Sequence, residues 1–254
     1  MNSALTIAHF TLKKAFREKV YLILLLATAA VVAAAGSVSF YQTGVQIKFL
    51  KDVSMFALSS FGFLLALFAA TELLPYEMDT RGVHFLASKP VDRFTIVLGK
   101  YLALVGLLAA NLVPLMAEVF GLVWLYAGKP HWDLISGAGL VLLELAVYGA
   151  MVMLLSLVLT RLVAFFSAIF LYAVAHLSNW IATTFLAGSP AWLRFGATAA
   201  LALVPDLSHF DSRYVVVHGY SVPPMFLAAL LAYALLYVAA ALLACRWVLE
   251  SKEL

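Results

Sequence analysis

Charge is scarce in this chain of 254 residues. Asp, Glu, Lys and Arg together make up 11% of it, whereas soluble domains carry about 25%. Hydrophobic residues account for 65%, and the mean hydropathy is +1.03. This composition excludes an ordinary soluble domain and predicts an all-α, polytopic membrane protein.

Cysteine is nearly absent, since Cys245 is the single one, and this excludes a disulfide framework. Basic residues lie near the ends of apolar runs rather than in one block, so they indicate membrane topology and predict no nucleic-acid partner. No cleavable signal peptide is evident, because the first apolar run follows the basic stretch 13–19 and is long enough to span. The motif G-x-x-x-x-G-K-[ST] is also missing, so we expect any ATP to be bound by another chain.

Apolar runs long enough to cross a bilayer predict six transmembrane helices. We expect them at 20–40, 53–75, 95–126, 135–159, 162–187 and 223–249. The third exceeds a straight span and contains Pro114, which predicts a kink or an extension beyond the bilayer. No repeat period or low-complexity linker interrupts the chain, so residues 1–254 are expected to form one membrane domain.

The distribution of Lys and Arg predicts the orientation. With the N-terminus inside, the cytoplasmic side collects most basic residues: Lys13, Lys14, Arg17, Lys19, Arg81, Lys89, Arg93, Lys100, Arg161, Arg246 and Lys252. The outer side receives Lys48, Lys51, Lys129, Arg194 and Arg213. Because cytoplasmic loops are enriched in Lys and Arg, we expect a multi-pass protein of the plasma (inner) membrane with both termini cytoplasmic.

Two segments outside the spans have helical patterns of their own. Residues 1–19 carry an apolar stripe with basic residues mostly off it, which predicts an amphipathic helix at the inner membrane surface. The stripe consists of Leu5, Ala8, Leu12, Ala15 and Phe16. Residues 188–222 hold an apolar stretch at about 195–204 that is too short to cross, and it predicts an outer-side re-entrant or interfacial helix before the last span.

The stretch 72–100, between the second and third spans, holds much of the charge in the chain. Pro75 is expected to close the second span, and a short helix is expected from Tyr76 to Ala87. Ser88-Lys89-Pro90 then ends this helix, because proline cannot continue the hydrogen-bond ladder. A helix parallel to the membrane suits contact with a cytosolic protein, and a solvated loop that only fixes topology fits the same pattern.

Three stretches together resemble one family. Glu77–Tyr101 reads E-x-x-x-R-x-x-x-F-L-x-S-K-P-V-x-R-F-x-x-V-L-G-K-Y and resembles the first cytoplasmic loop of ABC-2-type permeases, the membrane subunits of ATP-binding cassette (ABC) exporters. Thr11–Lys19 (T-L-K-K-A-F-R-E-K) is similar to their entry helix, and Val204–Asp211 (V-P-D-L-S-H-F-D) to an outer segment before their last span. With six spans and both ends inside, the resemblance covers essentially the whole chain.

This resemblance implies that the chain is the permease subunit of an exporter, with a coupling helix at Glu77–Ala87 inside the loop 76–94. It also implies a second permease copy, in a homodimer or heterodimer, and two cytosolic ABC ATPase subunits that bind ATP and Mg. No catalytic residue, metal or cofactor is then expected in this chain. The residues implied to couple to the ATPase are Glu77, Asp79, Arg81, His84, Phe85, Leu86, Lys89, Pro90 and Arg93. Asp79-Thr80-Arg81-Gly82 departs from the acidic residue and Gly/Thr pair common in that loop.

Polar residues inside the apolar spans are Asn111, Glu118, Glu144 and His176. Counted from the outer helix ends, the three ionisable ones lie roughly 12–17 Å deep and are expected to share one layer. They are candidates for a polar lining of the translocation path or a protonatable cluster, and buried groups that join neighbouring helices by hydrogen bonds are the alternative. Asn111 lies near Pro114, where local hydrogen bonds of a kink are the other interpretation.

Two other functions stay open. An intramembrane enzyme, such as a protease or lipid-modifying protein, would use His176 and Asn179, three residues apart, but no G-x-S-x-G, H-E-x-x-H or paired acidic motif accompanies them. An ion-coupled secondary transporter is the other alternative, and the inverted halves typical of many such proteins are not visible. The apolar spans are compatible with a lipid-like or amphipathic cargo.

Overall fold

The computed structural model describes residues 2–40, 42–73, 92–185, 190–201, 203–220 and 222–251. Within these residues, six helices are long and apolar enough to cross a membrane. They are α2 (Lys19–Ser37), α3 (Thr43–Leu73), α6 (Arg93–Ala127), α7 (Asp133–Val158), α8 (Arg161–Trp180) and α11 (Pro224–Ser251). The predicted all-helical fold is therefore confirmed for the described part of the chain, and its six apolar helices support a multi-pass membrane protein.

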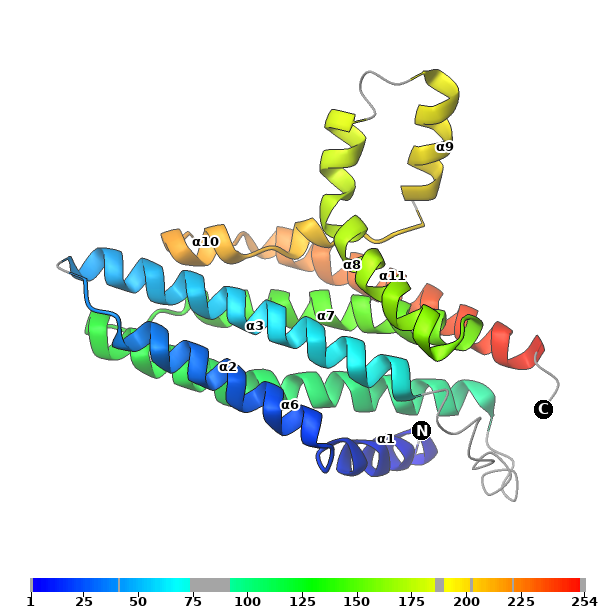
Figure 1. Cartoon of the computed structure of the whole chain (residues 1–254), viewed down its shortest axis with the longest axis horizontal. Helices are drawn as coiled ribbons and strands as arrows, with labels where there is room; N and C mark the ends of the chain where they lie inside the picture. The colour runs from blue at the N-terminus through cyan, green and yellow to red at the C-terminus, as the bar shows by residue number, and fades with distance from the viewer. Residues whose placement is uncertain are drawn as a thin grey trace.

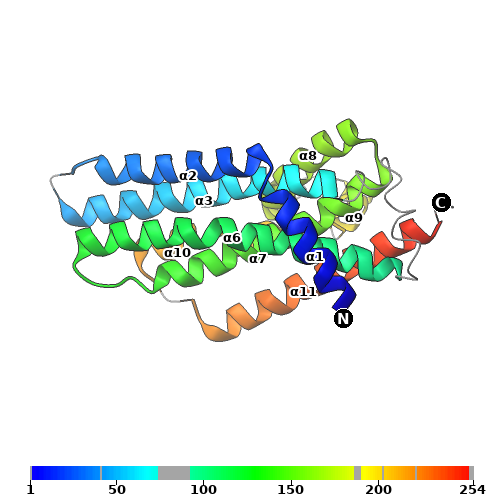
Figure 2. The same cartoon turned by 90° about the horizontal axis from the view of Figure 1, so that it is seen from below.

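Helices α2, α3, α6, α7 and α11 run side by side as the body of the bundle (Figures 1 and 2). α3 packs against α2, α6 and α7, and α11 packs against α6 and α7. Small residues allow close packing, since a Cβ on Gly62 would lie 2.5 Å from Leu145 Cδ1 and one on Gly149 would lie 2.6 Å from Leu104 Cδ2. Such contacts matter in lipid, where tight packing rather than water exclusion holds helices together.

The two ends of the bundle differ in what they carry. The start of α1 (Asn2–Ala15), the end of α3, the start of α6 and the end of α11 share one end, called here the terminal end (Figures 1 and 2). The turns between α2 and α3 and between α6 and α7 share the opposite end, called here the far end. Leu73 and Asp92, which bound residues 74–91, therefore lie at the same end as the two termini.

The second and third spans differ from a simple crossing. α3 begins at Thr43 rather than at the predicted 53, because Lys51 and Asp52 have partners in the fold instead of marking a loop. α6 is 35 residues long and contains Pro114 without ending there. At 1.5 Å per residue its length is about 52 Å. This length exceeds the hydrocarbon layer of about 30 Å, so the expected extension beyond the bilayer follows from the helix itself.

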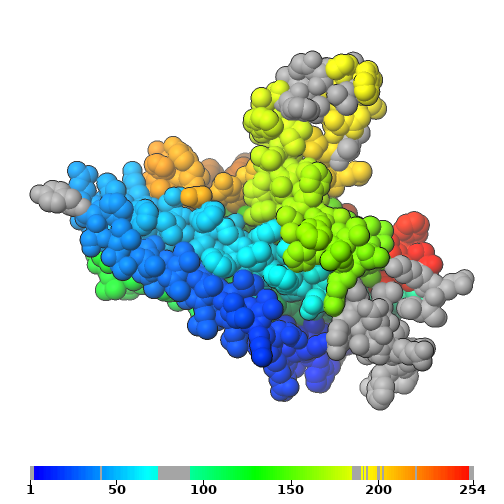
Figure 3. Space-filling model, in the orientation of Figure 1, coloured from blue at the N-terminus to red at the C-terminus, as the bar shows by residue number. Residues whose placement is uncertain are grey.

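The segment before α11 forms several short helices. α8 continues as a π-helical turn (Ile181–Phe185), and then come α9 (Ala191–Leu201), the 3₁₀ turn η2 (Leu207–Phe210) and α10 (Arg213–His218). The end of α8 and α9 stand away from the side of the bundle (Figures 1 and 3). α9 lies inside the segment 188–222 that was predicted to hold a short helix, and its re-entrant or interfacial role stays a prediction.

Helix α1 packs across α6 at the terminal end. Its predicted helical structure is present. Leu12 and Ala15 of the predicted stripe pack against the bundle on the same side as Ala4 and Ile7, whereas Leu5 is 59% exposed. The close contact depends on Gly99 of α6, where an added Cβ would lie 2.8 Å from Ala4 O and 2.9 Å from Ile7 Cβ. Ala4 and Ile7 of α1 can therefore approach α6 closely because Gly99 has no side chain.

We predict that Gly99→Ala loosens α1, because the new methyl meets a backbone oxygen that cannot rotate away. An overpacked contact costs about 1–3 kcal/mol, so amide hydrogen exchange in α1 should rise roughly tenfold or more in detergent. Gly106→Ala is the matched control, since its Cβ would lie 3.6 Å from Leu12 Cδ2, an ordinary contact. Equal protection of α1 in both variants would contradict this account.

Candidate functional site

Of the residues implied to couple to an ATPase, the structure describes Arg93 alone. Arg93 is the first residue of α6, and its Nη1 donates a hydrogen bond to Leu249 O, which joins the start of α6 to the end of α11. The others lie outside the described residues: Glu77, Asp79, Arg81, His84, Phe85, Leu86, Lys89 and Pro90. Their coupling role stays a prediction.

Two of the predicted intramembrane residues meet where α7 and α8 pack. His176 Nε2 lies 3.5 Å from Glu144 Oε1, and the hydroxyl of Tyr172 donates a hydrogen bond of 2.9 Å to the same oxygen. The Glu144 side chain is 3% exposed and that of His176 is 29% exposed. The structure thus builds a carboxylate, a phenol and an imidazole into one cluster, called here the Glu144 cluster.

Aromatic rings surround this carboxylate. The Tyr172 ring lies 4.4 Å from the His176 ring, 4.2 Å from that of Phe63 and 5.2 Å from that of Tyr148, measured between centroids. Tyr148 in turn donates a hydrogen bond of 3.1 Å to Ala168 O, which ties α7 to α8 a second time. Side chains of α3, α7 and α8 therefore hold the cluster in place.

The hydrogen bonds of His176 limit the protons that the Glu144 cluster can hold. Nδ1 of His176 lies 3.3 Å from Tyr172 O, a carbonyl that can only accept. If Nδ1 carries a proton, a neutral ring would present a bare Nε2 to a carboxylate, and two acceptors would face each other. One further proton supplies the missing donor between these two acceptors. On Nε2 it gives an imidazolium–carboxylate pair, and on Glu144 it gives an uncharged acid. The arrangement is therefore suited to holding a proton, or another cation in its place, inside the bundle.

Asn111 and Glu118 lie apart from the Glu144 cluster. Asn111 is buried in α6, and its Oδ1 has no hydrogen-bond partner among the described residues. Glu118, also on α6, is half-buried, and in the described part of the chain no hydrogen bond or ion pair joins it to Glu144 or His176. The sequence placed three ionisable residues in one layer, and the structure brings two of them into contact.

A second polar network, at the far end, was not expected from the sequence. Lys51 of α3 is 2% exposed and donates a hydrogen bond to Asp133, the first residue of α7. Its Nζ also lies 3.0 Å from His131 Nδ1 and 3.2 Å from Val216 O. These bonds join α3, the α6–α7 turn, α7 and α10. The sequence signal was weak, because Lys51 stands next to Asp52 and close to Lys48, as expected of residues in an outer loop.

The neighbouring residue contributes a parallel link. Asp52 accepts hydrogen bonds from Arg213 of α10, with Nη2 at 2.9 Å from Oδ2, and the guanidinium lies 5.3 Å from the centre of the Phe56 ring. The hydrogen bond to Asp52 raises the pKa of Arg213 further, so the pair stays charged. Two adjacent residues of α3 thus hold the segment before α11 against the bundle.

Comparison with protein-family models and with curated proteins found no match for this chain.

Proposed function

We propose that this chain is the permease subunit of an ATP-driven ABC transporter. It forms an export path and catalyses no reaction of its own. The observation that carries the proposal is the shared position of both termini, α1 and the ends of α3 and α6 that bound the loop 74–91. A partner that pushes on this loop acts directly on two spanning helices. α1, packed on α6, lies beside the same point of contact.

Charge supports a cytoplasmic position for the terminal end. Basic residues lie at this end on α1, α2, α6, α8 and α11 and in the turn between α1 and α2: Lys13, Lys14, Arg17, Lys19, Arg93, Arg161 and Arg246. Since basic residues are retained on the cytoplasmic side, both termini and the coupling loop would face the cytosol of a plasma (inner) membrane.

The proposed mechanism begins at the loop. Two cytosolic ABC ATPase subunits bind ATP and Mg, close on each other and carry the loops of two permease copies with them. α3 and α6 transmit this movement, because α3 packs on α7 and α8 and α6 packs on α7. The bundle then shifts toward an outward-open state, since that state makes the better contacts with the closed ATPases.

The Glu144 cluster is the proposed polar element of the path, with Asn111 and Glu118 as further lining. It lies at the contact of α3 with α7 and α8, so movement of α3 would alter its surroundings. The other surfaces of the spans are apolar, which suits an amphipathic cargo.

The same cluster favours a second candidate, a proton-coupled secondary transporter. A buried carboxylate and imidazole that share a proton are a known basis for proton movement in membrane proteins. Cargo uptake into proteoliposomes driven by a pH gradient, without ATP or an ATPase, would support this alternative over the first.

The topology can be tested by cysteine labelling in cells. In a background with Cys245→Ala, single cysteines would replace His84, Lys129 and Ser251. A membrane-impermeant maleimide should label position 129 in intact cells, because the α6–α7 turn is at the far end. Positions 84 and 251 should react only after the membrane is opened. Labelling of position 84 in intact cells would overturn the proposed coupling role.

A further inference from the structure

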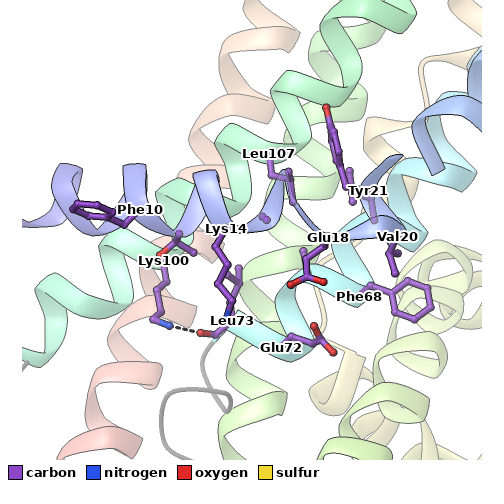
Figure 4. A pocket seen from close by; sticks show the side chains of 14 residues that line it. Phe10, Lys14, Glu18, Val20, Tyr21, Phe68, Glu72, Leu73, Lys100 and Leu107 are labelled. Carbon is purple, nitrogen blue, oxygen red and sulfur yellow. Dashed lines mark hydrogen bonds between the residues drawn. The ribbon is translucent and has the colours of Figure 1, made fainter. Parts of the chain in front are cut away.

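A cavity of about 350 Å³ lies at the terminal end, between α1, the start of α2, the end of α3 and α6 (Figure 4). Much of its wall is apolar and includes Val20, Tyr21, Leu65, Phe68 and Leu107. Small-molecule sites usually occupy about 300–1,000 Å³, with mostly apolar walls and a few placed polar groups. The cavity has the size and character of such a site.

Charged side chains gather on one part of this wall. Figure 4 shows the carboxylates of Glu18, in the turn between α1 and α2, and of Glu72, near the end of α3, facing the same space, with Lys14 of α1 beside them. Glu72 also lies 3.5 Å from Arg161, and both of these side chains are more than half exposed. Glu18 is exposed as well, so a ligand amine can approach both carboxylates from the surface.

Lys100 has a different role in the same wall. It is 2% exposed, and its Nζ donates a hydrogen bond to the carbonyl oxygen of Leu73, which is the last residue of α3 (Figure 4). This bond fixes the end of α3 against α6, so the wall that presents Glu72 is held in place. Contacts within the fold thus fix the wall of the cavity.

The cavity lies where spanning helices end. α2 begins at Lys19 and α3 is described to Leu73, and charged residues at such ends lie at the level of lipid headgroups. On α1, Leu5 is 59% exposed and Phe10, which also lines the cavity, is 65% exposed, which suits a helix immersed in the membrane interface. A ligand that enters here comes from the adjacent lipid leaflet.

We propose that this cavity binds one aminophospholipid, with its primary ammonium between Glu18 and Glu72, its phosphate near Lys14 and part of an acyl chain against Tyr21 and Phe68. A primary ammonium donates up to three hydrogen bonds, and ionised carboxylates accept them strongly. A choline headgroup has no N–H to donate, and a glycerol headgroup brings a phosphate charge to two carboxylates without a cation. This lipid would bind beside α1, and its binding requires no ATPase partner.

Native mass spectrometry of the full chain in detergent tests this directly. The probes are phosphatidylethanolamine, phosphatidylcholine and phosphatidylglycerol with identical acyl chains. We expect the wild type to bind phosphatidylethanolamine about tenfold more tightly than the other two, a difference of about 1.4 kcal/mol. The double variant Glu18→Gln/Glu72→Gln should bind the three lipids with nearly equal affinity. Glu250→Gln is the matched control, because Glu250 lies at the same end, pairs with Arg246 and does not line the cavity.

Ala69→Phe provides a second, independent test, since it fills the cavity without changing charge and should reduce binding of all three lipids. Soluble glycerophosphoethanolamine in excess should fail to displace the lipid, because it lacks the acyl contact. The proposal is overturned if the preference persists in Glu18→Gln/Glu72→Gln, if phosphatidylglycerol binds best, if Ala69→Phe leaves binding unchanged, or if the soluble headgroup competes fully.

Discussion

Asp133→Ala is expected to lower the free energy of unfolding by about 3–5 kcal/mol, the cost of removing one partner from a buried ion pair. Lys51 is 2% exposed, so its ammonium would stay buried, and His131 and Val216 O would be its remaining hydrogen-bond partners among the described residues. The loss should appear in SDS-driven unfolding in mixed micelles. It should be accompanied by faster hydrogen exchange in α10, which the same network holds.

A double variant separates the charge from the packing. Lys51→Met/Asp133→Ala removes both charges and should recover much of the stability lost in Asp133→Ala, since no buried ion is left unpaired. Lys129→Ala, in the same turn but exposed, should change stability by less than about 0.5 kcal/mol. If the double variant is less stable than Asp133→Ala, the network does not work as an ion pair.

His176→Leu is expected to have the second large effect, about 1–3 kcal/mol, because it removes the imidazole that shares a proton with a carboxyl group that is 3% exposed and leaves this group without its partner. Glu144 would keep only the hydroxyl of Tyr172 as a donor among the contacts described. Unfolding free energy in mixed micelles is again the measurement. Loosening should centre on the contact between α7 and α8.

Glu144→Gln supplies the control for this prediction. A neutral amide can still accept from Tyr172, so Glu144→Gln alone should cost little, and adding it to His176→Leu should restore most of the stability. If His176→Leu is equally destabilising with Glu or Gln at position 144, the two side chains are not coupled. The Glu144 cluster would then be a packing feature.

The six spans could be predicted because a membrane crossing is a local property of the sequence. About twenty apolar residues in a row suffice to identify each one, and α2 and α7 begin within two residues of their predicted starts. The helix at the N-terminus was predicted by the same local reasoning. Its docking onto α6 was not predicted, because the close contact of Ala4 and Ile7 depends on Gly99, which lies far along the chain.

The polar networks were harder to predict, because their partners are distant in sequence. Lys51 was assigned to an outer loop on its charge, whereas its partner Asp133 lies 82 residues away and makes burial of the charge tolerable. Glu144 and His176 were recognised as costly residues inside spans. Tyr172 was missed, although it lies one helical turn before His176 and therefore on the same face.

The coupling helix remains a prediction from the loop sequence, and the proposed function depends on it. The most direct measurement is photo-crosslinking from position 85, with a photoreactive amino acid in place of Phe85, in cells that express the full chain. We predict a crosslink to a soluble protein that carries G-x-x-x-x-G-K-[ST], and loss of association with that protein in Phe85→Asp but not in Lys129→Asp. A crosslink to lipid or to outer-side proteins alone, or cargo transport by the purified chain without any ATPase, would contradict the account.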